Sequence, residues 1–567
     1  MSAIKITSND SLTDIEKHFR ISAGPGAGKT HWLTEHIKDV LHRSTRLEKT
    51  RKIACITYTN TAVETILSRL GTSSERAEIS TIHSFLYKHI IKPYIHLIAL
   101  EYNLNVAEID GHDDTILSNY SFLNTWKAKT SQYHLTDDNL IIQAFKAIRW
   151  KFDNKTKDLV AKPDYPQKVG SYSIKTTSYL EYKKMAWEKG VIHHDDVLFF
   201  SYQIVKKFPY VLEVLRAKFP YIFIDEFQDS NPIQVFIFKE IGTKESIIGI
   251  IGDKAQSIYE FQGADPTQFQ AFNLPGIIDY VITENRRSTN EIIDVLNLIR
   301  KDIVQEKHRN ISDIKPTIIV GEAAKAIKKI INRYNNEAVY SLSRDNITAN
   351  MMKKQMGGQH NPKLFEKLTE ADNPSSNNKY RSKIISICIK AIEYAREGKF
   401  KDAIKEMEKE FKSKTDPTKG KEIALNHIVT LLSNYEHYKD NNLLNFFNIV
   451  KRDIKPEISD LRSGKAKTFY DNHTFQQMAL CVKIAEDTSH NKTIHKAKGD
   501  EFKNVLLVLS EEKDLQFLLK PDLENKEEHR INYVAVSRAK NKLFISVPTL
   551  NSTNKTFLES HFDITTI

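Results

Sequence analysis

The chain has 567 residues, 40% hydrophobic and 27% charged, which predicts several folded domains and excludes a largely disordered protein. Its formal net charge of +11 favours a polyanionic partner, because Lys and Arg side chains that neutralise phosphates release counterions, although a merely well-solvated basic surface has the same composition. No apolar run of about 18 residues and no leader with a cleavage site is evident, so we expect a cytoplasmic protein. Cys55, Cys388 and Cys481 are scattered and lack the spacing of a zinc site, so we expect no disulfide framework.

Short, nearly continuous apolar runs mark the predicted strands. Such runs are typical of parallel strands buried on both faces, and longer helical patterns separate them. They occur on both sides of a long middle stretch, which favours two α/β cores with inserted segments. We expect both inserted segments, about 88–195 and 350–485, to be mostly helical. The predicted strands are Lys52–Thr57, Tyr221–Ile224, Ser246–Ile251, Val505–Leu509 and Lys542–Val547.

The first chemical signal is the glycine-rich stretch Ile21–Thr30 (ISAGPGAGKT), which follows a short predicted strand and opens a helix. Its glycines let backbone N–H groups converge on phosphate oxygens, and the helix N-terminus adds its positive end. Lys29 is expected to neutralise the β- and γ-phosphates of ATP, and the Thr30 hydroxyl to hold Mg²⁺. The strict pattern has Gly where Ala23 stands, so the match is to a variant, and alone it predicts only nucleotide binding. The predicted ATP-binding residues of this loop are Ala23, Gly24, Pro25, Gly26, Ala27, Gly28, Lys29 and Thr30.

Two adjacent acids follow the apolar strand Tyr221–Ile224. Because the carboxyl end of a parallel strand lies over the ligand crevice, Asp225 is expected to reach the Mg²⁺ shell and Glu226 to polarise the attacking water. An acidic turn after a core strand is common in itself, but a phosphate loop needs such a partner. Together the two motifs predict an enzyme that hydrolyses a nucleoside triphosphate.

The phosphate loop and the acidic strand resemble those of the superfamily 1 P-loop ATPases, specifically the UvrD/Rep/PcrA helicases. Further stretches carry the resemblance in the family's order, and the whole set covers a little over half the chain. The resemblance implies two RecA-like parallel-sheet motor domains, the cofactors ATP and Mg²⁺, and 3′ to 5′ movement on single-stranded DNA. These stretches are Ile56–Asn60 with Ala62–Ile66, Ser80–Phe85, Ile192–Leu198, Ile250–Ala264, Thr493–Phe502 and Asn532–Ala539.

The resemblance also assigns roles around the nucleotide. The amide of Gln256, which follows a predicted strand, is expected to sense the γ-phosphate. Arg287 and Arg538 stand where the family keeps its arginine fingers, which stabilise charge on the transferred phosphoryl group. Both would reach across from the second core, so catalysis would require the two cores to close. Arg286 replaces the family's aromatic residue, so the adenine is expected to be sandwiched by its guanidinium or to be held loosely. Glu501 is expected to make a polar contact near the nucleotide or DNA.

An aromatic pair is predicted to contact DNA. Tyr259 and Phe261 can offer π-faces to unstacked bases, since stacking contributes about 1–3 kcal/mol per base and tolerates any sequence. Core packing is the usual role of two aromatics at this spacing, but the polar neighbours Glu260 and Gln262 favour an exposed loop. By resemblance, the other predicted DNA-contacting residues are Tyr58, Thr59, Asn60, His83 and His495.

The motifs divide the chain into the family's parts. We expect motor domain 1A in residues 1–87 and 196–285, a 1B-like helical insertion in 88–195, motor domain 2A in 286–350 and 486–567, and a 2B-like helical insertion in 351–485.

Several departures from the family pattern bear on function. Residues 1–20 contain no glutamine that could recognise adenine. Phe261 and Gln262 replace a Trp and an Arg that are usual in the family, and this replacement predicts weaker DNA binding. These features resemble the small UvrD-like subunits of bacterial anti-phage systems, notably the helicase subunit of the Gabija system, which works beside an OLD-family nuclease. That resemblance implies a nuclease partner.

The leading hypothesis is an ATP-dependent DNA helicase or translocase that acts in DNA repair or anti-phage defence. One alternative is a regulatory subunit of a nuclease complex that senses nucleotide or DNA and unwinds little by itself. Another is an RNA-directed motor, since stacking on bases does not depend on the 2′-OH of the sugar.

Overall fold

The protein is described by a computed structural model that covers residues 3–109, 116, 120–153, 158–334, 337–358, 360–375, 377–411, 416–484 and 489–567. The chain forms two compact units. Unit 1 consists of Met1–Ser312 and Pro521–Ser537, and unit 2 consists of Asp313–Lys520 and Arg538–Ile567. Residues 286–312, which we predicted to open the second motor domain, pack within unit 1. Within the described ranges, no helix combines the length and apolar character needed to cross a bilayer.

Unit 1 is built on a seven-stranded parallel sheet with the order β1-β11-β2-β10-β9-β3-β4. Its strands, in that order, are Ile4–Ile6, Ile278–Ile282, Phe19–Ala23, Ile247–Gly252, Tyr221–Ile224, Ile53–Thr57 and Ala77–Thr81.

The central strands of this sheet are buried on both faces. Ile53 and Cys55 of β3 pack in one hydrophobic core, whereas Ala54 and Ile56 pack in the other. Because successive side chains of a strand point to opposite faces, a sheet covered on both sides requires the continuous apolar runs by which these strands were predicted.

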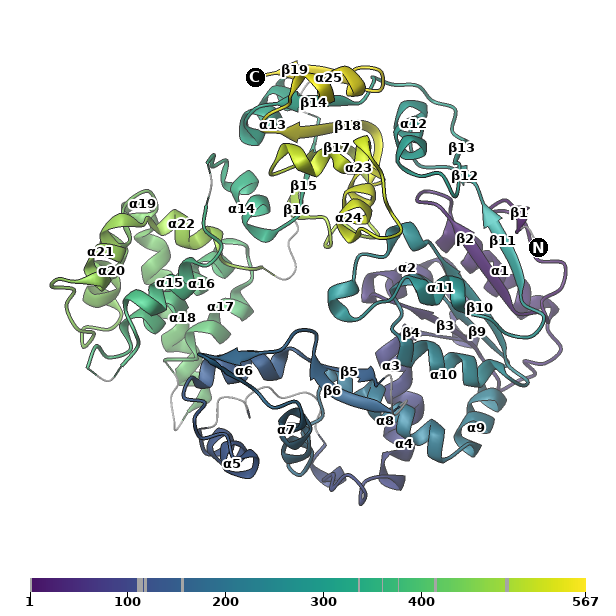
Figure 1. The fold of residues 1–567 in the computed structure, drawn as a ribbon, viewed down its shortest axis with the longest axis horizontal. Coiled ribbons are helices and arrows are strands. Elements are labelled where there is room, and N and C mark those ends of the chain that lie inside the picture. Colours follow the sequence, from purple (N-terminus) through teal and green to yellow (C-terminus); the bar gives the residue numbers. More distant parts are fainter. Residues whose placement is uncertain are drawn as a thin grey trace. The chain divides into compact units, whose positions relative to one another are not determined.

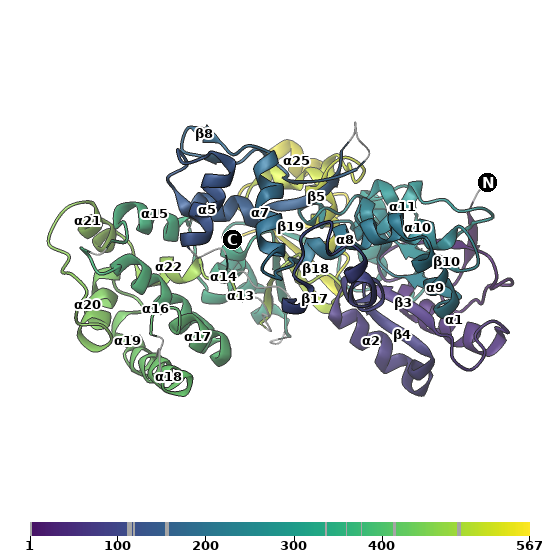
Figure 2. The same cartoon turned by 90° about the horizontal axis from the view of Figure 1, so that it is seen from below.

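Helices cover both faces of the unit 1 sheet, and Figure 2 shows α2 beside β4. The segment Pro521–Ser537, which is remote in sequence, adds helix α24 to this unit. The helices are α1 (Lys29–Arg43), α2 (Asn60–Leu70), α3 (Ile82–Leu86), α8 (His194–Lys207), α9 (Tyr210–Lys218), α10 (Pro232–Gly242), α11 (Thr267–Ala271), α12 (Asn290–Ile299) and α24 (Glu527–Val536), and a short parallel pair is formed by β12 (Glu284–Asn285) and β13 (Glu306–Lys307).

The described part of segment 88–195 contains two antiparallel strand pairs beside its helices, and we did not predict these strands. In the first pair Ile148 and Trp150 are buried, and the Trp150 ring stacks on Phe199 of α8 with centroids 3.8 Å apart. This is the alternation of a half-buried strand. The elements are α4 (Lys92–Tyr94), α5 (Tyr120–Thr130), α6 (Asp138–Lys146), β5 (Ile148–Phe152), β6 (Leu159–Pro163), β7 (Lys168–Val169), β8 (Tyr172–Ser173) and α7 (Thr177–Trp187).

Unit 2 contains a six-stranded parallel sheet with the order β16-β15-β17-β18-β14-β19. The two large parallel sheets confirm the predicted α/β fold class. In the order just given for unit 2, the strands are Asn491–Thr493, Tyr340–Ser343, Phe502–Val508, Ala539–Val547, Thr317–Val320 and Asp563–Thr566. The accompanying helices are α13 (Ala323–Arg333), α14 (Asn346–Lys354), α23 (Gln516–Leu519) and α25 (Ser552–Leu558).

A separate group of helices, green in Figure 1, fills the second insertion around its own hydrophobic core. Ile384, Cys388 and Ile392 recur every four residues on α16 and are fully buried, which is the pattern of one helix face packed on its neighbours. The helices are α15 (Leu364–Ala371), α16 (Arg381–Arg396), α17 (Phe400–Met407), α18 (Pro417–Ser433), α19 (Tyr435–Tyr438), α20 (Leu443–Asp453), α21 (Lys465–Asn472) and α22 (Phe475–Leu480).

Candidate functional site

The predicted phosphate loop runs from the end of β2 to the start of α1. Gly26 and Gly28 have φ of +74° and +81°, a left-handed conformation that other residues rarely adopt. Gly28 is the N-cap of α1, so the first N–H groups of that helix have no partner within the helix and open onto the loop. Lys29 Nζ donates to the Ala23 carbonyl at 3.3 Å, which keeps the ammonium group at the loop. The local geometry therefore suits a bound anion.

The two predicted acids lie at the carboxyl end of β9. Asp225 is 3% exposed, and its N–H donates to the Ile56 carbonyl at 2.8 Å. Burial and the neighbouring Glu226 carboxylate raise the pKa of Asp225, whereas Lys29 lowers it. A buried carboxyl group crowded by a second one is stabilised in its charged form by a cation, and carboxylate and hydroxyl oxygens are the ligands that Mg²⁺ prefers. Asp225 therefore suits the metal role predicted for it, and the role of the Thr30 hydroxyl stays a prediction.

A series of hydrogen bonds joins the acids to Gln256. Gln228 Nε2 donates to Glu226 Oε2 at 2.5 Å, and Gln228 Oε1 accepts from the Asp253 N–H at 2.9 Å. Gln256 Nε2 in turn donates to Asp253 Oδ2 at 2.7 Å. Asp253 also forms a fully buried ion pair with Arg300, 2.7 Å between Nη1 and Oδ1. The sequence prediction missed Gln228, although it lies in the acidic stretch itself, and Arg300, for which no motif gave a signal.

The two arginines after β12 lie beside the phosphate loop within unit 1. The Arg286 N–H donates to the Gly26 carbonyl at 2.9 Å, while its side chain forms an ion pair of 2.8 Å with Glu284. Arg287 Nη1 donates to the Ser537 carbonyl at 2.8 Å. Both predicted nucleotide residues are thus tied to the loop or to the segment that carries α24.

Two further side chains hold the phosphate loop. Gln305 Nε2 donates to the Pro25 carbonyl at 2.9 Å, and Asn285 Nδ2 donates to Gln305 Oε1 at 3.0 Å. Both residues are buried. The sequence prediction missed them because Gln305 follows the loop by 280 positions and belongs to no motif.

The remaining predicted nucleotide residues belong to unit 2. Arg538 is 3% exposed, its Nη1 donates to the Asp500 carbonyl at 3.4 Å, and its own carbonyl accepts from the Phe502 N–H at 2.9 Å. Glu501 forms an ion pair of 2.8 Å with Lys540. Glu501 and Arg538 therefore lie next to each other where β17 and β18 begin.

Comparison with known families accounts for both units. Residues 7–275 match the UvrD/REP helicase N-terminal domain, and residues 363–549 match the UvrD-like helicase C-terminal domain. The chain belongs to the UvrD-like helicase family.

Individual proteins of this family are similar to the chain at low identity. ATP-dependent DNA helicase PcrA of Bacillus subtilis (strain 168) is 26% identical over 321 residues, 55% of this chain and 41% of PcrA. Gabija protein GajB of Bacillus cereus (strain HuB5-5) is 27% identical over 337 residues, 50% of this chain and 47% of GajB. A probable DNA helicase II homolog of Rickettsia conorii (strain ATCC VR-613 / Malish 7) is 26% identical over 611 residues, 92% of this chain and 89% of that protein. The chain spans less than half the length of PcrA and GajB.

Unit 1 of this UvrD-like chain contains a cleft of about 1160 Å³. Tyr58 lies in its wall, stacks on Tyr259 with ring centroids 4.9 Å apart, and donates a hydrogen bond of 2.7 Å to Gln262 Oε1. Phe261 also lines the cleft and is 54% exposed. The structure thus gathers most of the predicted DNA-contacting residues in one place, while His495 lies in unit 2. The predicted residues that line the cleft are Tyr58, Thr59, Asn60, His83 and Phe261.

Basic residues that the sequence prediction missed line the same cleft. Lys146 and Arg149 come from the end of α6 and from β5, and Lys88 comes from the segment after α3. They lie within the insertion, where no motif singled them out. Cations at the edge of a cleft lined by exposed aromatics suit a phosphate backbone.

Proposed function

We propose that this chain is an ATP-dependent DNA helicase or translocase that moves 3′ to 5′ on single-stranded DNA. The observation that carries the proposal is the hydrogen-bond series from Glu226 through Gln228 and Asp253 to Gln256. The series connects Glu226, the acid expected to activate water, with the loop that bears Tyr259. Binding of DNA in the unit 1 cleft can therefore alter the groups that face the phosphates of ATP.

Hydrolysis is assigned to the residues around the phosphate loop. Lys29 and the N–H groups at the start of α1 hold the β- and γ-phosphates, and Glu226 accepts a proton from the water that attacks the γ-phosphorus. As the water oxygen bonds to the γ-phosphorus, the bond between this phosphorus and the oxygen that bridges to the β-phosphate breaks. The products are ADP and phosphate. Mg²⁺, when held by Thr30 and Asp225, supplies positive charge to the phosphate oxygens.

We assign the stabilisation of negative charge in the transition state to Arg287 and Arg538. Arg287 is bound to the carbonyl of Ser537, and Arg538 is the next residue of the chain. A displacement of the segment Pro521–Ser537 therefore acts on both arginines, one directly and one through the covalent backbone. We infer that both guanidinium groups stabilise charge on the transferred phosphoryl group during hydrolysis.

The first test is the rate of ATP hydrolysis with and without single-stranded DNA. We expect DNA to stimulate hydrolysis, and Lys29→Ala to lower the stimulated kcat by about 100-fold or more, because one fixed cation at the transferring phosphate is lost. Lys38→Ala, which removes a partly exposed lysine of the same helix, controls for the lost charge. A rate that DNA leaves unchanged, or undiminished hydrolysis by Lys29→Ala, would contradict the proposal.

A second candidate function is a regulatory role beside a nuclease. The similarity to Gabija protein GajB and the replacement of a usual Trp by Phe261 favour it. In this case the chain senses nucleotide or DNA ends and relays that state to an OLD-family nuclease. Strand separation measured with and without the co-expressed nuclease distinguishes the two, since robust unwinding by the chain alone excludes the regulatory role.

A further inference from the structure

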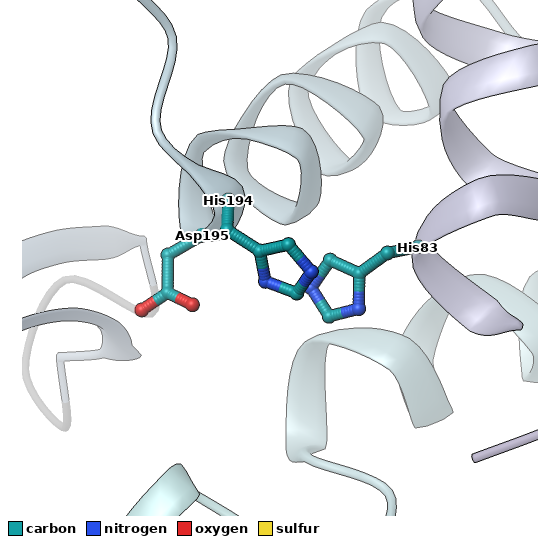
Figure 3. A group of neighbouring side chains, drawn as sticks. All are labelled: His83, His194 and Asp195. Carbon is teal, nitrogen blue, oxygen red and sulfur yellow. The ribbon is translucent and has the colours of Figure 1, made fainter. Parts of the chain in front are cut away.

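Two histidines and an aspartate meet in the wall of the unit 1 cleft. His83 belongs to α3, while His194 and Asp195 form the start of α8. Figure 3 shows the two imidazole rings against each other, with the Asp195 side chain beside the His194 ring. The ring centroids are 3.6 Å apart, and one nitrogen or carboxylate oxygen from each of the three residues lies within 4.8 Å of the others.

One imidazole of the cluster, that of His83, is incompletely satisfied. Its Nε2 is buried, and within the described part of the chain no hydrogen-bond partner reaches it. An enclosed polar atom without a partner is destabilising, and a bound ligand would satisfy it.

The carboxylate is also incompletely satisfied. Asp195 Oδ2 is buried and makes no hydrogen bond to any described residue, although Arg149 Nε approaches it at 3.5 Å. A stronger and closer cation would stabilise this group.

The neighbouring Asp196 fixes the turn that presents these ligands. Its carboxylate accepts from Trp150 Nε1 at 2.8 Å and from the His193 N–H at 2.9 Å, and it pairs with Lys183 at 2.9 Å. Acidic residues are common in the first turn of any helix because they complement its dipole. That rule accounts for Asp195 and Asp196, but it gives no reason for two stacked imidazoles.

We propose that His83, His194 and Asp195 bind a first-row divalent transition metal ion such as Zn²⁺. Two imidazole nitrogens and a carboxylate oxygen are ligands that such ions accept at about 2.0–2.2 Å, whereas Mg²⁺ and Ca²⁺ prefer oxygen donors alone. Tetrahedral coordination sets ligand atoms about 3.4 Å apart, so shifts of about 1 Å close the site. His194 is the exposed member of the three. The fourth position then faces the cleft.

The test is Zn²⁺ titration of the chelator-treated full chain by calorimetry, with the retained metal counted after gel filtration. We expect one equivalent to bind, with the affinity reduced at least about tenfold by His194→Phe, which keeps an aromatic ring against His83, and by Asp195→Asn. His96→Ala, which removes another exposed histidine of the same unit, should leave the affinity unchanged.

Bound Co²⁺ gives a second readout, because its visible absorption reports nitrogen ligation in the wild-type chain and should be lost in His194→Phe. Thermal unfolding of each variant without metal establishes that it is folded. Absence of saturable binding, or equal affinity in the wild type and both ligand variants, would overturn the proposal. The titration uses neither nucleotide nor DNA, so its outcome is independent of the motor proposal.

Discussion

Glu226 is held in a left-handed backbone conformation, with φ of +52°, at the end of a buried strand. For a residue other than glycine this conformation costs on the order of 1–3 kcal/mol and persists only where the surroundings impose it. Here the Glu226 N–H donates to Asp225 Oδ1 at 2.9 Å, and Gln228 holds the carboxylate. The backbone conformation and Gln228 together fix the Glu226 carboxylate, as its proposed role toward water requires.

The raised pKa of Asp225 gives a prediction about stability. Between the ordinary carboxyl pKa and the raised value, the folded state binds more protons than the unfolded state, so stability falls as pH rises through this window. Asp225→Asn removes the effect. Without nucleotide or Mg²⁺ it should stabilise the protein at pH 7.5 by on the order of 1 kcal/mol, with no gain near pH 4.

Denaturant unfolding of both proteins across this pH range measures the effect, and DNA-stimulated hydrolysis measures its functional counterpart. The variant should be more stable and nearly inactive, because the carboxylate is retained for metal binding and not for folding. Stability curves that stay parallel from pH 4 to 7.5 would contradict this account.

Helix α24 holds the loop that carries the aromatic pair Tyr259 and Phe261. Arg530 Nε donates to the Ser257 carbonyl at 2.8 Å, and its guanidinium pairs with Glu260. Lys254 pairs with Glu524 at 2.9 Å, just before the helix. The helix thereby connects this loop to Ser537, where Arg287 is bound.

Breaking this connection should uncouple DNA from hydrolysis. We expect Arg530→Gln to reduce the stimulation by single-stranded DNA several-fold, because hydrogen bonds of a charged group contribute about 1.5–3 kcal/mol each. The affinity for ATP should stay within about twofold. Lys526→Gln, an exposed change on the same segment, is the matched control. Full stimulation in Arg530→Gln would rule out this route of coupling.

The exposed ring of Phe261 supports a prediction about affinity. Loss of one stacking contact costs about 1–3 kcal/mol, so Phe261→Ala should weaken binding of single-stranded DNA about 5- to 150-fold. Fluorescence anisotropy with a labelled oligonucleotide measures this at a fixed salt concentration. Tyr165→Ala removes a ring that is 78% exposed and does not line the cleft. If both variants bind alike, Phe261 makes no such contact.

Sequence patterns predicted the elements whose signal is local. Continuous apolar runs predicted β9 and β10, and the glycine-rich loop predicted the start of α1. Strand β5 was missed because its alternation, Ile148 to Phe152, spans only five residues within a stretch of scattered aromatics. Gln305 and Arg300 were missed for a different reason, since their contacts join residues far apart in the chain and leave no pattern around them.

The molecule as a whole consists of two parallel-sheet units whose chain crosses between them three times, after Ser312, Lys520 and Ser537. The last crossing lies between Ser537 and Arg538, the predicted arginine finger. The central claim is that Arg538, a residue of unit 2, stabilises charge on the triphosphate during hydrolysis.

The most direct test of this claim is DNA-stimulated ATP hydrolysis by Arg538→Ala. We predict that kcat falls by about 10³–10⁵, the usual contribution of an arginine finger, while ATP still binds. Arg452→Ala, a change at an arginine of unit 2 whose side chain is 67% exposed, controls for the lost charge and should hydrolyse ATP like the wild type. A kcat for Arg538→Ala within a few-fold of the wild-type value would contradict the claim that unit 2 contributes to the chemistry.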